Sequence, residues 1–367
     1  MIGTLLKLTY LHLSLTSLTG ELSPSITNLT QLEYFYIHDN LIGGPIPDEL
    51  GKLKNLLELD LRNNKLIGSI PSALGLLTNL SLLDLSFNEI NGSIVSEIGQ
   101  LKNLSTLDLQ QNKLTGPLLL SLGQLTNLMY FSLSSNQING FIPPEIGNMI
   151  NLSSLHLNNN KLNGSIPSTL GHLTNLISFS LSSNQINGSI PAELGNMTNL
   201  SDLYLNNNNI VGHIPSTIGH LTRLEILNLD WNQINGFLLV EMANCSLLYS
   251  LSLSHNYLIG TIPSWVGDSF IPNKIDLSYN NLTDNVPLSL INIIDFNLSY
   301  NSLEGQIPYI FQNYGFDRFI GNKDLCGDIK GFPLCSPSSQ LMHLVKNFLP
   351  ITIFFMLLLL GYFFHSQ

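Results

Sequence analysis

The sequence predicts an α/β solenoid, a right-handed horseshoe or superhelix of about 13 coils of 24 residues with a parallel β-sheet on its concave side. The first observation behind this prediction is an asparagine that returns every 24 residues from Asn40 to Asn280. Thr16 precedes the series in the same frame, and Asn301 follows it after a gap of 21 residues. The second is the pattern Leu-x-x-Leu-x-Leu-x-x before most of these positions, with x-Leu-x-Gly-x-Ile-Pro after them. A fixed period of this length is typical of solenoids, in which each coil packs only on its neighbours.

The first half of each coil has the period of a strand with one buried face. Leu59 and Leu61 alternate with Asp60 and Arg62, so the leucines are expected to point inward and the charged residues outward. Asn64 carries two donors and an acceptor at the place where the chain turns inward. We therefore expect the recurring asparagine to satisfy backbone groups that burial would leave unpaired.

The second half of each coil carries turn residues. A glycine stands four residues after each asparagine from Gly44 to Gly260, which suits a bend with positive φ. Pro71 and its equivalents fix φ and are expected to start the convex return, where residues 72–75 can form one short helical turn. We assign these repeat residues no ligand role. The stacked strands predict a concave face on the order of 60 Å long, which suits an extended ligand or another protein.

Composition excludes several functions. Only 11% of the residues are charged, and the formal net charge is −11 without a basic cluster. This balance argues against nucleic acid and against anionic lipid surfaces as partners. Cys245 replaces a core leucine and is expected to be a buried hydrophobe, whereas Cys326 and Cys335 follow the last coil and can pair in an oxidising compartment. This segment offers too few ligands for a metal, and we expect no metal and no cofactor.

Twelve Asn-x-Ser/Thr sequons are candidate glycosylation sites if the chain enters the secretory pathway. They are Asn28, Asn79, Asn91, Asn103, Asn151, Asn163, Asn187, Asn196, Asn199, Asn244, Asn281 and Asn297. The repeat itself generates some of them, because Asn-Leu-Ser and Asn-Gly-Ser lie on consensus positions.

The segment 348–364 is a run of 17 residues without a charge, which is long enough for a short transmembrane helix. A core helix is the alternative, but nothing follows for it to pack against. Lys346 before the run weakly favours a cytosolic N-terminus. Small residues at Ser336, Ser338 and Ser339 leave open a lipid-anchor signal instead.

Outward positions on the concave strands lie six, four, two and one residues before each recurring asparagine, and two stretches of them depart from the average. The N-terminal stretch is aromatic and charged: Tyr10, His12, Tyr34, Tyr36, His38, Asp39, Glu58, Asp60, Arg62, Asp84, Phe87 and Asp108. The C-terminal stretch holds Asp202, Tyr204, Asp230, Trp231, His255, Lys274, Tyr279 and Tyr300. The coils between them carry mostly serine and are near copies of each other.

Trp231 is the strongest candidate contact, because a large exposed ring costs hydration unless something covers it. Lateral packing against neighbouring coils is the alternative. Leu-Asp-Leu is a common form of the repeat, which weakens Asp60, Asp84 and Asp108 as ligand-selecting residues. We expect no enzyme activity, because no His is placed near a Cys or Ser with a plausible base partner and the acidic pairs have no cleft.

The x-Leu-x-Gly-x-Ile-Pro half of each unit resembles the plant-type leucine-rich repeat. The ending Phe319-Ile-Gly-Asn-Lys-Asp-Leu-Cys-Gly327, with Cys335 after it, resembles the cysteine-paired cap of the same proteins. Nearly the whole chain is similar to the extracellular region of plant receptor-like kinases and kinase-free receptor-like proteins, in particular the male-discoverer-interacting receptor kinases. The resemblance implies a cell-surface receptor that binds a secreted peptide on its concave face and recruits a co-receptor kinase ectodomain near the last coils.

Several family features are missing from the sequence. Met1-Ile2-Gly3-Thr4 leads directly into a coil without a secretory signal or an N-terminal cysteine-paired cap, so we expect an uncovered apolar end. No glycine-rich nucleotide loop, His-Arg-Asp or Asp-Phe-Gly motif of a kinase follows the apolar run. The chain resembles a truncated receptor. We expect a solenoid over 1–310, a cap over 311–336, a linker over 337–347, a transmembrane helix over 348–364 and a tail over 365–367.

The first functional hypothesis is therefore a membrane-anchored recognition protein, single-pass at the plasma membrane with extracellular repeats, that signals only through a partner. Its affinity is expected to concentrate in Tyr204, Asp230 and Trp231. A leucine-rich inhibitor of a secreted cell-wall-degrading enzyme and a nonfunctional receptor fragment are the alternatives. The apolar run distinguishes the first from the inhibitor, which would end after the cap.

Overall fold

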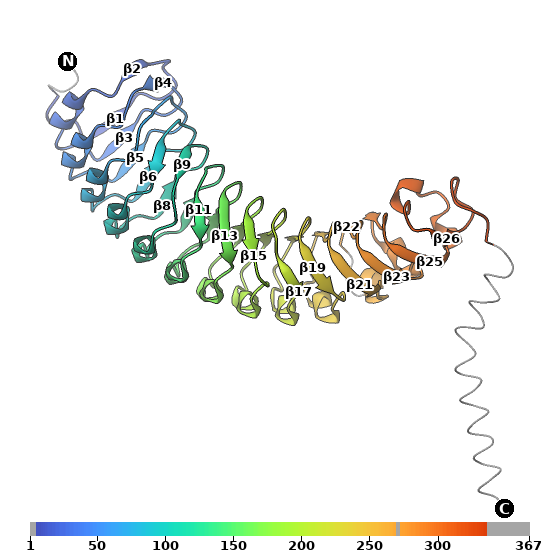
Figure 1. The fold of residues 1–367 in the computed structure, drawn as a ribbon. Coiled ribbons are helices and arrows are strands. Elements are labelled where there is room, and N and C mark those ends of the chain that lie inside the picture. Colours follow the sequence, from blue (N-terminus) through green and yellow to red (C-terminus); the bar gives the residue numbers. More distant parts are fainter. Residues whose placement is uncertain (1–4, 269–271, 336–367) are drawn as a thin grey trace, which may run out of the picture.

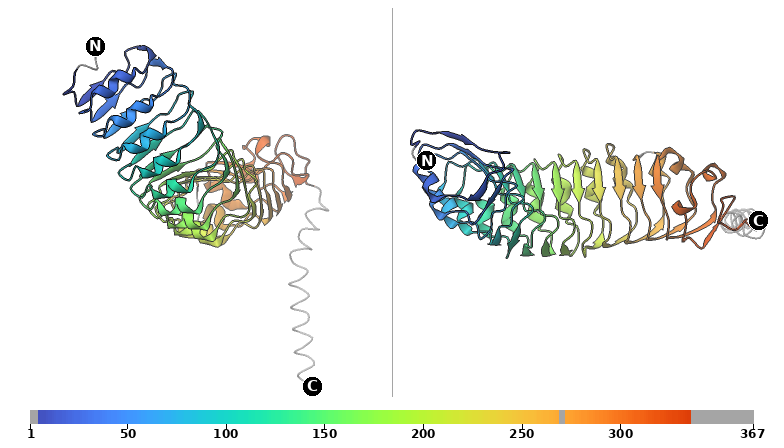
Figure 2. Two further views of the ribbon diagram at one scale, coloured as in Figure 1. Left: turned by 60° about the vertical axis from the view of Figure 1, so that its left-hand side comes forward. Right: turned by 90° about the horizontal axis from the view of Figure 1, so that it is seen from above.

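The computed structural model describes residues 5–268 and 272–335. Their coils stack side by side into a curved row, with the N-terminus at one end and short helices along the outer side (Figure 1). Figure 2 shows from above that the row is one coil wide. The expected linker, transmembrane helix and tail lie outside the described residues. Within the described part of the chain, no helix is long and apolar enough to cross a membrane.

The concave side is one parallel sheet of 13 strands in sequence order. Neighbouring strands pair in a register of 24 residues, as in Tyr10 with Tyr34, and the last pair, Lys274 with Asp295, reproduces the gap of 21 seen in the sequence. The strands are β1 Tyr10–His12, β3 Tyr34–Tyr36, β5 Glu58–Asp60, β6 Leu82–Asp84, β8 Thr106–Asp108, β10 Tyr130–Ser132, β12 Ser154–His156, β14 Ser178–Ser180, β16 Asp202–Tyr204, β18 Ile226–Asn228, β20 Ser250–Ser252, β22 Lys274–Asp276 and β24 Asp295–Asn297.

Shorter sheets form where each coil leaves the recurring asparagine. Their strands are β2 Thr19–Glu21 with β4 Leu41–Gly43, β7 Asn91–Ser93 with β9 Lys113–Thr115, β11 Asn139–Phe141 with β13 Lys161–Ser165 and β15 Gln185–Asn187, and β17 Val211–His213 with β19 Gln233–Gly236, β21 Tyr257–Thr261, β23 Asn281–Asp284, β25 Ser302–Gln306 and β26 Asp324–Cys326. These sheets line the flank of the solenoid beside the concave face and are called the flank sheets below.

The convex side carries short 3₁₀ helices and one short α segment. They are η2 Pro24–Asn28, η3 Asp48–Lys52, η4 Ser72–Leu76, η5 Ser96–Gln100, η6 Leu120–Gln124, η7 Pro144–Asn148, η8 Ser168–His172, η9 Ala192–Asn196, η10 Ser216–His220, η11 Val240–Asn244, α1 Trp265–Asp268, η12 Leu288–Asn292, η13 Tyr309–Phe311 and η14 Phe316–Arg318. The predicted helical turn at 72–75 is thus confirmed as η4. Its glycine packs closely on the next coil, since a Cβ on Gly75 would lie 2.4 Å from the Glu97 carbonyl oxygen.

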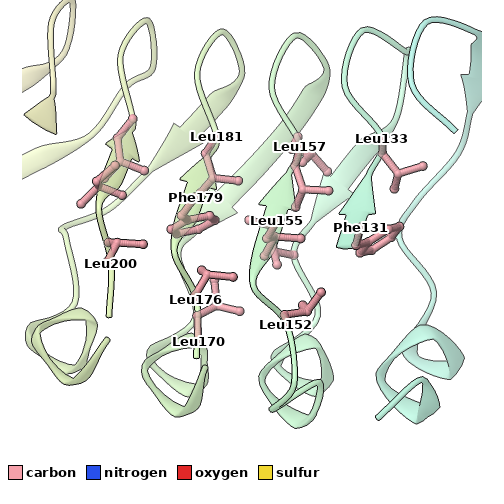
Figure 3. Packing of buried hydrophobic residues seen from close by; sticks show 14 of the residues in the cluster. Phe131, Leu133, Leu152, Leu155, Leu157, Leu170, Leu176, Phe179, Leu181 and Leu200 are labelled. Carbon is pink, nitrogen blue, oxygen red and sulfur yellow. The ribbon is translucent and has the colours of Figure 1, made fainter. Parts of the chain in front are cut away.

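The core runs through the middle of the stack as rows of identical positions. Figure 3 shows Leu133, Leu157 and Leu181 aligned from coil to coil, with Phe131 and Phe179 in a second row on either side of Leu155. All five side chains are fully buried. Each coil can bury its apolar side only against its neighbours, which explains why the period is kept so strictly.

The recurring asparagine does what the sequence predicted. Asn160 donates from Nδ2 to the carbonyl oxygens of Leu133, one coil earlier, at 2.9 Å and of Leu157 at 3.2 Å. Its Oδ1 accepts the N–H of Ile138 at 2.9 Å. One side chain therefore satisfies backbone groups of two coils, and the same set of bonds recurs along the solenoid.

A second asparagine row was not foreseen. Asn55, Asn79, Asn103, Asn127, Asn151, Asn175 and Asn199 each donate Nδ2–H to the carbonyl oxygen 25 residues earlier. The bond from Asn103 to Thr78, for example, is 3.0 Å long. This row joins neighbouring coils on the way back to the concave sheet, so it has a structural role of its own.

The two ends of the solenoid differ. At the C-terminal end, β26 pairs with β25, and Cys326 forms a disulfide with Cys335 as predicted. Cys245 is buried, also as predicted, and burial raises the pKa of its thiol to about 11. At the N-terminal end, a hollow of about 370 Å³ opens onto core side chains that include Leu11, Leu22 and Ile42.

Candidate functional site: the concave face

The outermost row of the concave face has an unusual backbone. The residue just before each recurring asparagine has positive φ, for example 57° at Asp39 and 53° at Trp231. Asn, Asp and Ser tolerate this region best, because bulky side chains crowd the backbone there. Six of the twelve residues in this row from 39 to 300 are Asn, Asp or Ser. Phe87 is an isolated aromatic exception, whereas positions 231, 255, 279 and 300 carry four aromatic rings in succession, and this run marks the site.

Four rings form a continuous stack, called the aromatic ladder below. Its members are Trp231, His255, Tyr279 and Tyr300. Ring centroids are 3.6 Å apart between Trp231 and His255, then 4.1 Å and 4.2 Å for the next two pairs. The planes lie within 17° of parallel. Trp231 nevertheless stays 56% exposed, and the two tyrosines are 42% and 43% exposed.

Trp231 therefore packs laterally on the next coil, as the alternative reading expected, while much of its ring stays exposed. Its contact with a ligand stays a prediction. Each stacked pair is worth about 1 kcal/mol, which helps to hold bulky residues at positive φ. The ladder ends at Gly321, where a Cβ would lie 2.6 Å from a ring carbon of Tyr300. A rigid ridge results, with the ring of Trp231 at its free end.

Asp230 lies beneath the ladder and is engaged by the protein itself. Its carboxylate accepts the Ser252 hydroxyl at 2.5 Å and the Ser254 N–H at 2.6 Å. Burial raises the pKa of Asp230, and these hydrogen bonds oppose that rise. Asp230 thus supports the next coil, whereas the sequence made it a ligand contact. Burial lowers the pKa of His255, against the attraction of the Asp230 and Asp276 charges.

Asp202 and Tyr204 lie on β16, the strand beside β18, after which Trp231 follows. Both side chains are half-buried, and Tyr204 pairs in register with Asn228. Burial raises the pKa of both side chains. A neighbouring acid raises it further in each case: Glu225 for Asp202, and Asp202 for Tyr204. The structure thus brings Asp202, Tyr204, Trp231 and His255 onto adjacent coils, as the sequence predicted.

A hollow of about 340 Å³ lies at the C-terminal end of the same face. It is lined by Lys274, Ile275, Asp276, Asp295, Phe296, Asn297, Asp317 and Arg318. Arg318 pairs with Asp295 at 2.9 Å and donates to the Phe296 carbonyl oxygen at 2.9 Å. Asp295 and Asn297 occupy the same outward positions as the predicted residues and could have been found by that rule. Arg318 comes from the cap segment, outside the repeat frame, and no periodic signal marks it.

The N-terminal patch is a network closed on itself. The rings of Tyr10, Tyr34 and Tyr36 lie 5.6–6.3 Å apart, with His12 and His38 beside them. Tyr36 donates its hydroxyl to Glu58 at 2.5 Å. Burial, followed by the hydrogen bond to this acid, raises the pKa of Tyr36.

Charged side chains extend the network along three coils. Arg62 reaches Asp60 at 2.7 Å and Asp84 at 3.6 Å. Asp39 accepts hydrogen bonds from Asn63 and His38. Both bonds lower the pKa of Asp39, and the bond from Asn63 has the larger effect. Phe87 stays exposed on the outermost row.

Asp60, Asp84 and Asp108 occupy one position of successive coils and are more buried than that outward position suggests. Asp60 is 5% and Asp108 7% exposed, and burial raises the pKa of both, to about 6 for Asp108. Each carboxylate accepts the N–H of the residue two positions on, as Asp108 does from Gln110 at 3.0 Å. These acids therefore fix strand ends, in keeping with the structural reading of Leu-Asp-Leu.

One histidine lies beside a serine. Nε2 of His156 is 3.1 Å from the Ser178 hydroxyl, and the ring of Tyr130 lies edge-on with its centroid 5.8 Å from that of His156. Burial lowers the pKa of His156. Residues 22 positions apart meet here because they lie on adjacent strands. Among the described residues no carboxylate accepts a hydrogen bond from His156, so the pair lacks the third group of a catalytic triad.

Neither Tyr130 nor His156 was singled out from the sequence, since the middle coils read as serine-rich copies. Ser132 and Ser180, which pair in register with His156 on either side, are buried. Within residues 5–268 and 272–335, no group of three or more His, Cys, Asp or Glu side chains is placed to hold a metal ion. The concave face offers hydrogen bonds, carboxylates and aromatic surface, which is the chemistry of recognition.

Comparison with known proteins agrees with this geometry. A leucine-rich repeat region model matches residues 106–266, and a leucine-rich repeat model matches 7–29, 31–53, 55–77, 79–101 and 292–314. A probable LRR receptor-like serine/threonine-protein kinase of Arabidopsis thaliana is 39% identical over 79 residues, which are 20% of this chain and 8% of that kinase.

Solved ectodomains match over most of the solenoid. The LRR ectodomain of the Arabidopsis receptor kinase HAESA, in complex with an extended IDA peptide hormone, is 34% identical with a TM-score of 0.77 over 87% of this chain and 58% of that one. HAESA in complex with IDA and the co-receptor SERK1 is 31% identical, with a TM-score of 0.66 over 90% and 64%. The chain thus spans less than two thirds of each of these proteins.

Proposed function

We propose that this leucine-rich-repeat solenoid, whose fold matches those of plant receptor ectodomains, binds a secreted peptide or a partner ectodomain on its concave face. The observation that carries the proposal is the aromatic ladder. It combines exposed aromatic area with rigidity, so little conformational freedom would be lost on binding. The rims of interfaces are polar, and Asp202, Tyr204 and Lys274 would supply such a rim around Trp231.

The place of the ladder also supports a second partner. The ladder runs along the edge of the concave sheet in the last coils, so a ligand in the groove and a second domain at the edge could both touch it. We propose a peptide in the groove and a co-receptor kinase ectodomain at this edge. HAESA is solved with such a pair, a peptide hormone and SERK1. Anchoring through 348–364, extracellular repeats and signalling only through the partner belong to the same proposal.

The experiment is a selection of 12-residue peptides from a random phage library against the solenoid. Enriched peptides are then titrated calorimetrically against the parent chain and Trp231→Ala. Loss of the indole should weaken binding at least tenfold, because interface Trp residues contribute about 2 kcal/mol or more. Tyr257→Ala is the matched control: Tyr257 is 62% exposed but lies on β21 of the flank sheets.

Two results would contradict the proposal. Peptides that bind equally well to the Trp231 variant would move the site away from the ladder. A library with no enrichment over an unrelated protein of similar charge would remove peptide binding altogether.

A further inference from the structure

The twelve sequons fall into two groups according to whether they lie on the concave sheet. Eleven lie off the concave sheet: on the flank sheets, at the ends of the convex 3₁₀ helices, or in the second asparagine row. Asn297 alone of the twelve lies on a concave strand, β24, with its side chain lining the hollow of about 340 Å³. It also stands three residues before Tyr300, the last ring of the ladder.

We propose that Asn297 is a glycan attachment site whose occupancy covers the C-terminal part of the concave face. The inference rests on the proposed function in two respects: attachment needs extracellular repeats, and its consequence is that a chain glycosylated here would lose its ligand. The attachment itself follows from the sequon Asn297-Leu298-Ser299 and from the space around the amide. Sequon glycans are bulky and solvated, so a sugar on this strand must rise over the hollow beside the ladder.

The contacts of Asn297 leave room for the bond. Its Oδ1 accepts the N–H of Ser299 at 3.1 Å, and Nδ2 donates to Asp276 at 3.4 Å. Nδ2 carries two hydrogens, so one can be replaced while the other keeps the contact with Asp276. Asn297 is half-buried and is one of the residues that line the hollow.

The reaction is a transfer of an oligosaccharide from a polyisoprenyl diphosphate carrier. A bond forms between Nδ2 and C1 of the first sugar, and the bond from C1 to the diphosphate oxygen breaks. Nδ2 releases one proton, and the lipid diphosphate leaves with the bonding electrons. The transfer acts on the chain before it folds, so the burial of Ser299 in the finished structure does not prevent it.

The neighbouring groups explain why a glycan here matters. Lys274, Asp276 and Asp295 share the hollow with Asn297, and they are the charged groups nearest the ladder on β22 and β24. A first sugar attached at Asn297 would fill this hollow, and the outer sugars would lie against Tyr279 and Tyr300. Sequons on the flank sheets, such as Asn281 on β23, place their sugars beside the concave face and leave it open.

The test uses the full chain, expressed in plant cells behind an added secretory signal and purified from their membranes. Glycopeptide mass spectrometry reads the occupancy of Asn297, and hydroxyl-radical footprinting reads the exposure of Tyr279 and Tyr300 without any ligand. We expect Asn297 to be occupied, and oxidation of both tyrosines to rise about threefold in Ser299→Ala, which removes the sequon but keeps the Asn297 side chain. Asn281→Gln is the matched control and should leave both values unchanged. Tyr10, at the far end of the sheet, is the internal reference.

The outcomes separate the two proposals. Glycans on other sequons with Asn297 bare, or an occupied Asn297 without protection of the tyrosines, would overturn this inference and leave the proposed function intact. An unglycosylated chain throughout would overturn it as well. If the footprint changes as expected but a selected peptide binds neither the glycosylated chain nor Ser299→Ala, the glycan site stands and the proposed function fails.

Discussion

The two aromatic regions of the concave face contain similar residues, but their side chains interact in different ways. In the N-terminal patch, polar side chains bind one another: Tyr36 donates a hydrogen bond to Glu58, and Arg62 forms ion pairs with Asp60 and Asp84. In the aromatic ladder, rings stack face to face and leave their edges in water, with Trp231 56% exposed. The polar atoms of the first region are already paired, and its exposed rings, Tyr10 and Phe87, do not form a continuous stack with each other. The second has apolar area that is rigid and uncovered.

The difference teaches that residue type alone does not mark a binding surface. Tyr, His and Asp were equally prominent in both regions of the sequence. Only the structure shows that the N-terminal residues satisfy one another, whereas the C-terminal rings hold one another in place for something else to touch. We therefore rank the ladder above the patch as the site of affinity. Four predictions test this comparison, beginning with the framework that both regions share.

The largest effect should come from the recurring asparagine and should be the same in both regions. Asn64→Ala and Asn256→Ala each remove bonds to three carbonyl oxygens and leave one buried N–H, of Ile42 or Ile234, without a partner. The expected loss is about 4 kcal/mol in each case, measured by urea unfolding followed by circular dichroism. A loss confined to one variant would mean that the two regions differ already in their framework.

The next effect should separate the regions. Gly321→Ala places a methyl group 2.6 Å from the Tyr300 ring and 2.9 Å from its Cα, at a φ of 83°. Gly20→Ala meets nothing within 4 Å, although its φ is 94°. We expect losses of about 3 and about 1 kcal/mol, because only the first adds overpacking to backbone strain. Equal losses would show that the ladder does not press on the cap.

A third effect concerns pH. Burial raises the pKa of Asp108 to about 6, above its value in the unfolded chain, so the folded state binds the proton more tightly. The contribution of Asp108 to stability should therefore be fully present below about pH 4 and should be lost as the pH rises through 6, a change of about 2 to 3 kcal/mol. Asp108→Asn keeps the shape and the acceptor for Gln110 but cannot ionise, so its stability should fall less steeply than that of the parent chain across this window.

The control for the pH experiment lies in the other region. Burial also raises the pKa of Asp230, but two strong hydrogen bonds oppose the rise. Asp230→Asn should flatten the profile less than Asp108→Asn does. A parent profile without a slope between pH 4 and 6 would contradict the raised pKa of Asp108. Thermal midpoints measured at half-unit steps of pH are sufficient.

Much of this architecture could be predicted from the sequence, because the period of the repeat shows which residues of neighbouring coils lie side by side. Asn64, Gly68 and Pro71 recur at fixed offsets, and each offset has one physical use in the coil. The positions of Trp231 and Tyr204 followed from the same frame. The disulfide between Cys326 and Cys335 was predicted from a resemblance and is present.

What could not be predicted from the sequence lies in contacts between coils. The stacking of His255 on Trp231 and the pairing of His156 with Ser178 join residues 22 to 24 positions apart, and their geometry depends on side-chain rotamers that a period does not specify. Asp230 was assigned to a ligand because its position points outward, yet its oxygens turn to Ser252 and Ser254. The repeat frame therefore predicts which side chains point outward, but not which of them have polar atoms free to bind a ligand.

The smallest effect gives the sharpest test of the comparison, because it removes one oxygen and keeps the ring. Tyr36→Phe deletes the hydroxyl that binds Glu58 and should cost about 1.5 kcal/mol of stability, the lower end of the range for a hydrogen bond to a charged group. Tyr279→Phe keeps the stack between His255 and Tyr300 and removes only an exposed hydrogen bond to Tyr300, so a clearly smaller loss of stability is expected. Binding of selected peptides should survive Tyr36→Phe unchanged, since that hydroxyl is already used. If Tyr36→Phe weakened binding while Tyr279→Phe destabilised the fold, the roles assigned to the two regions would have to be exchanged.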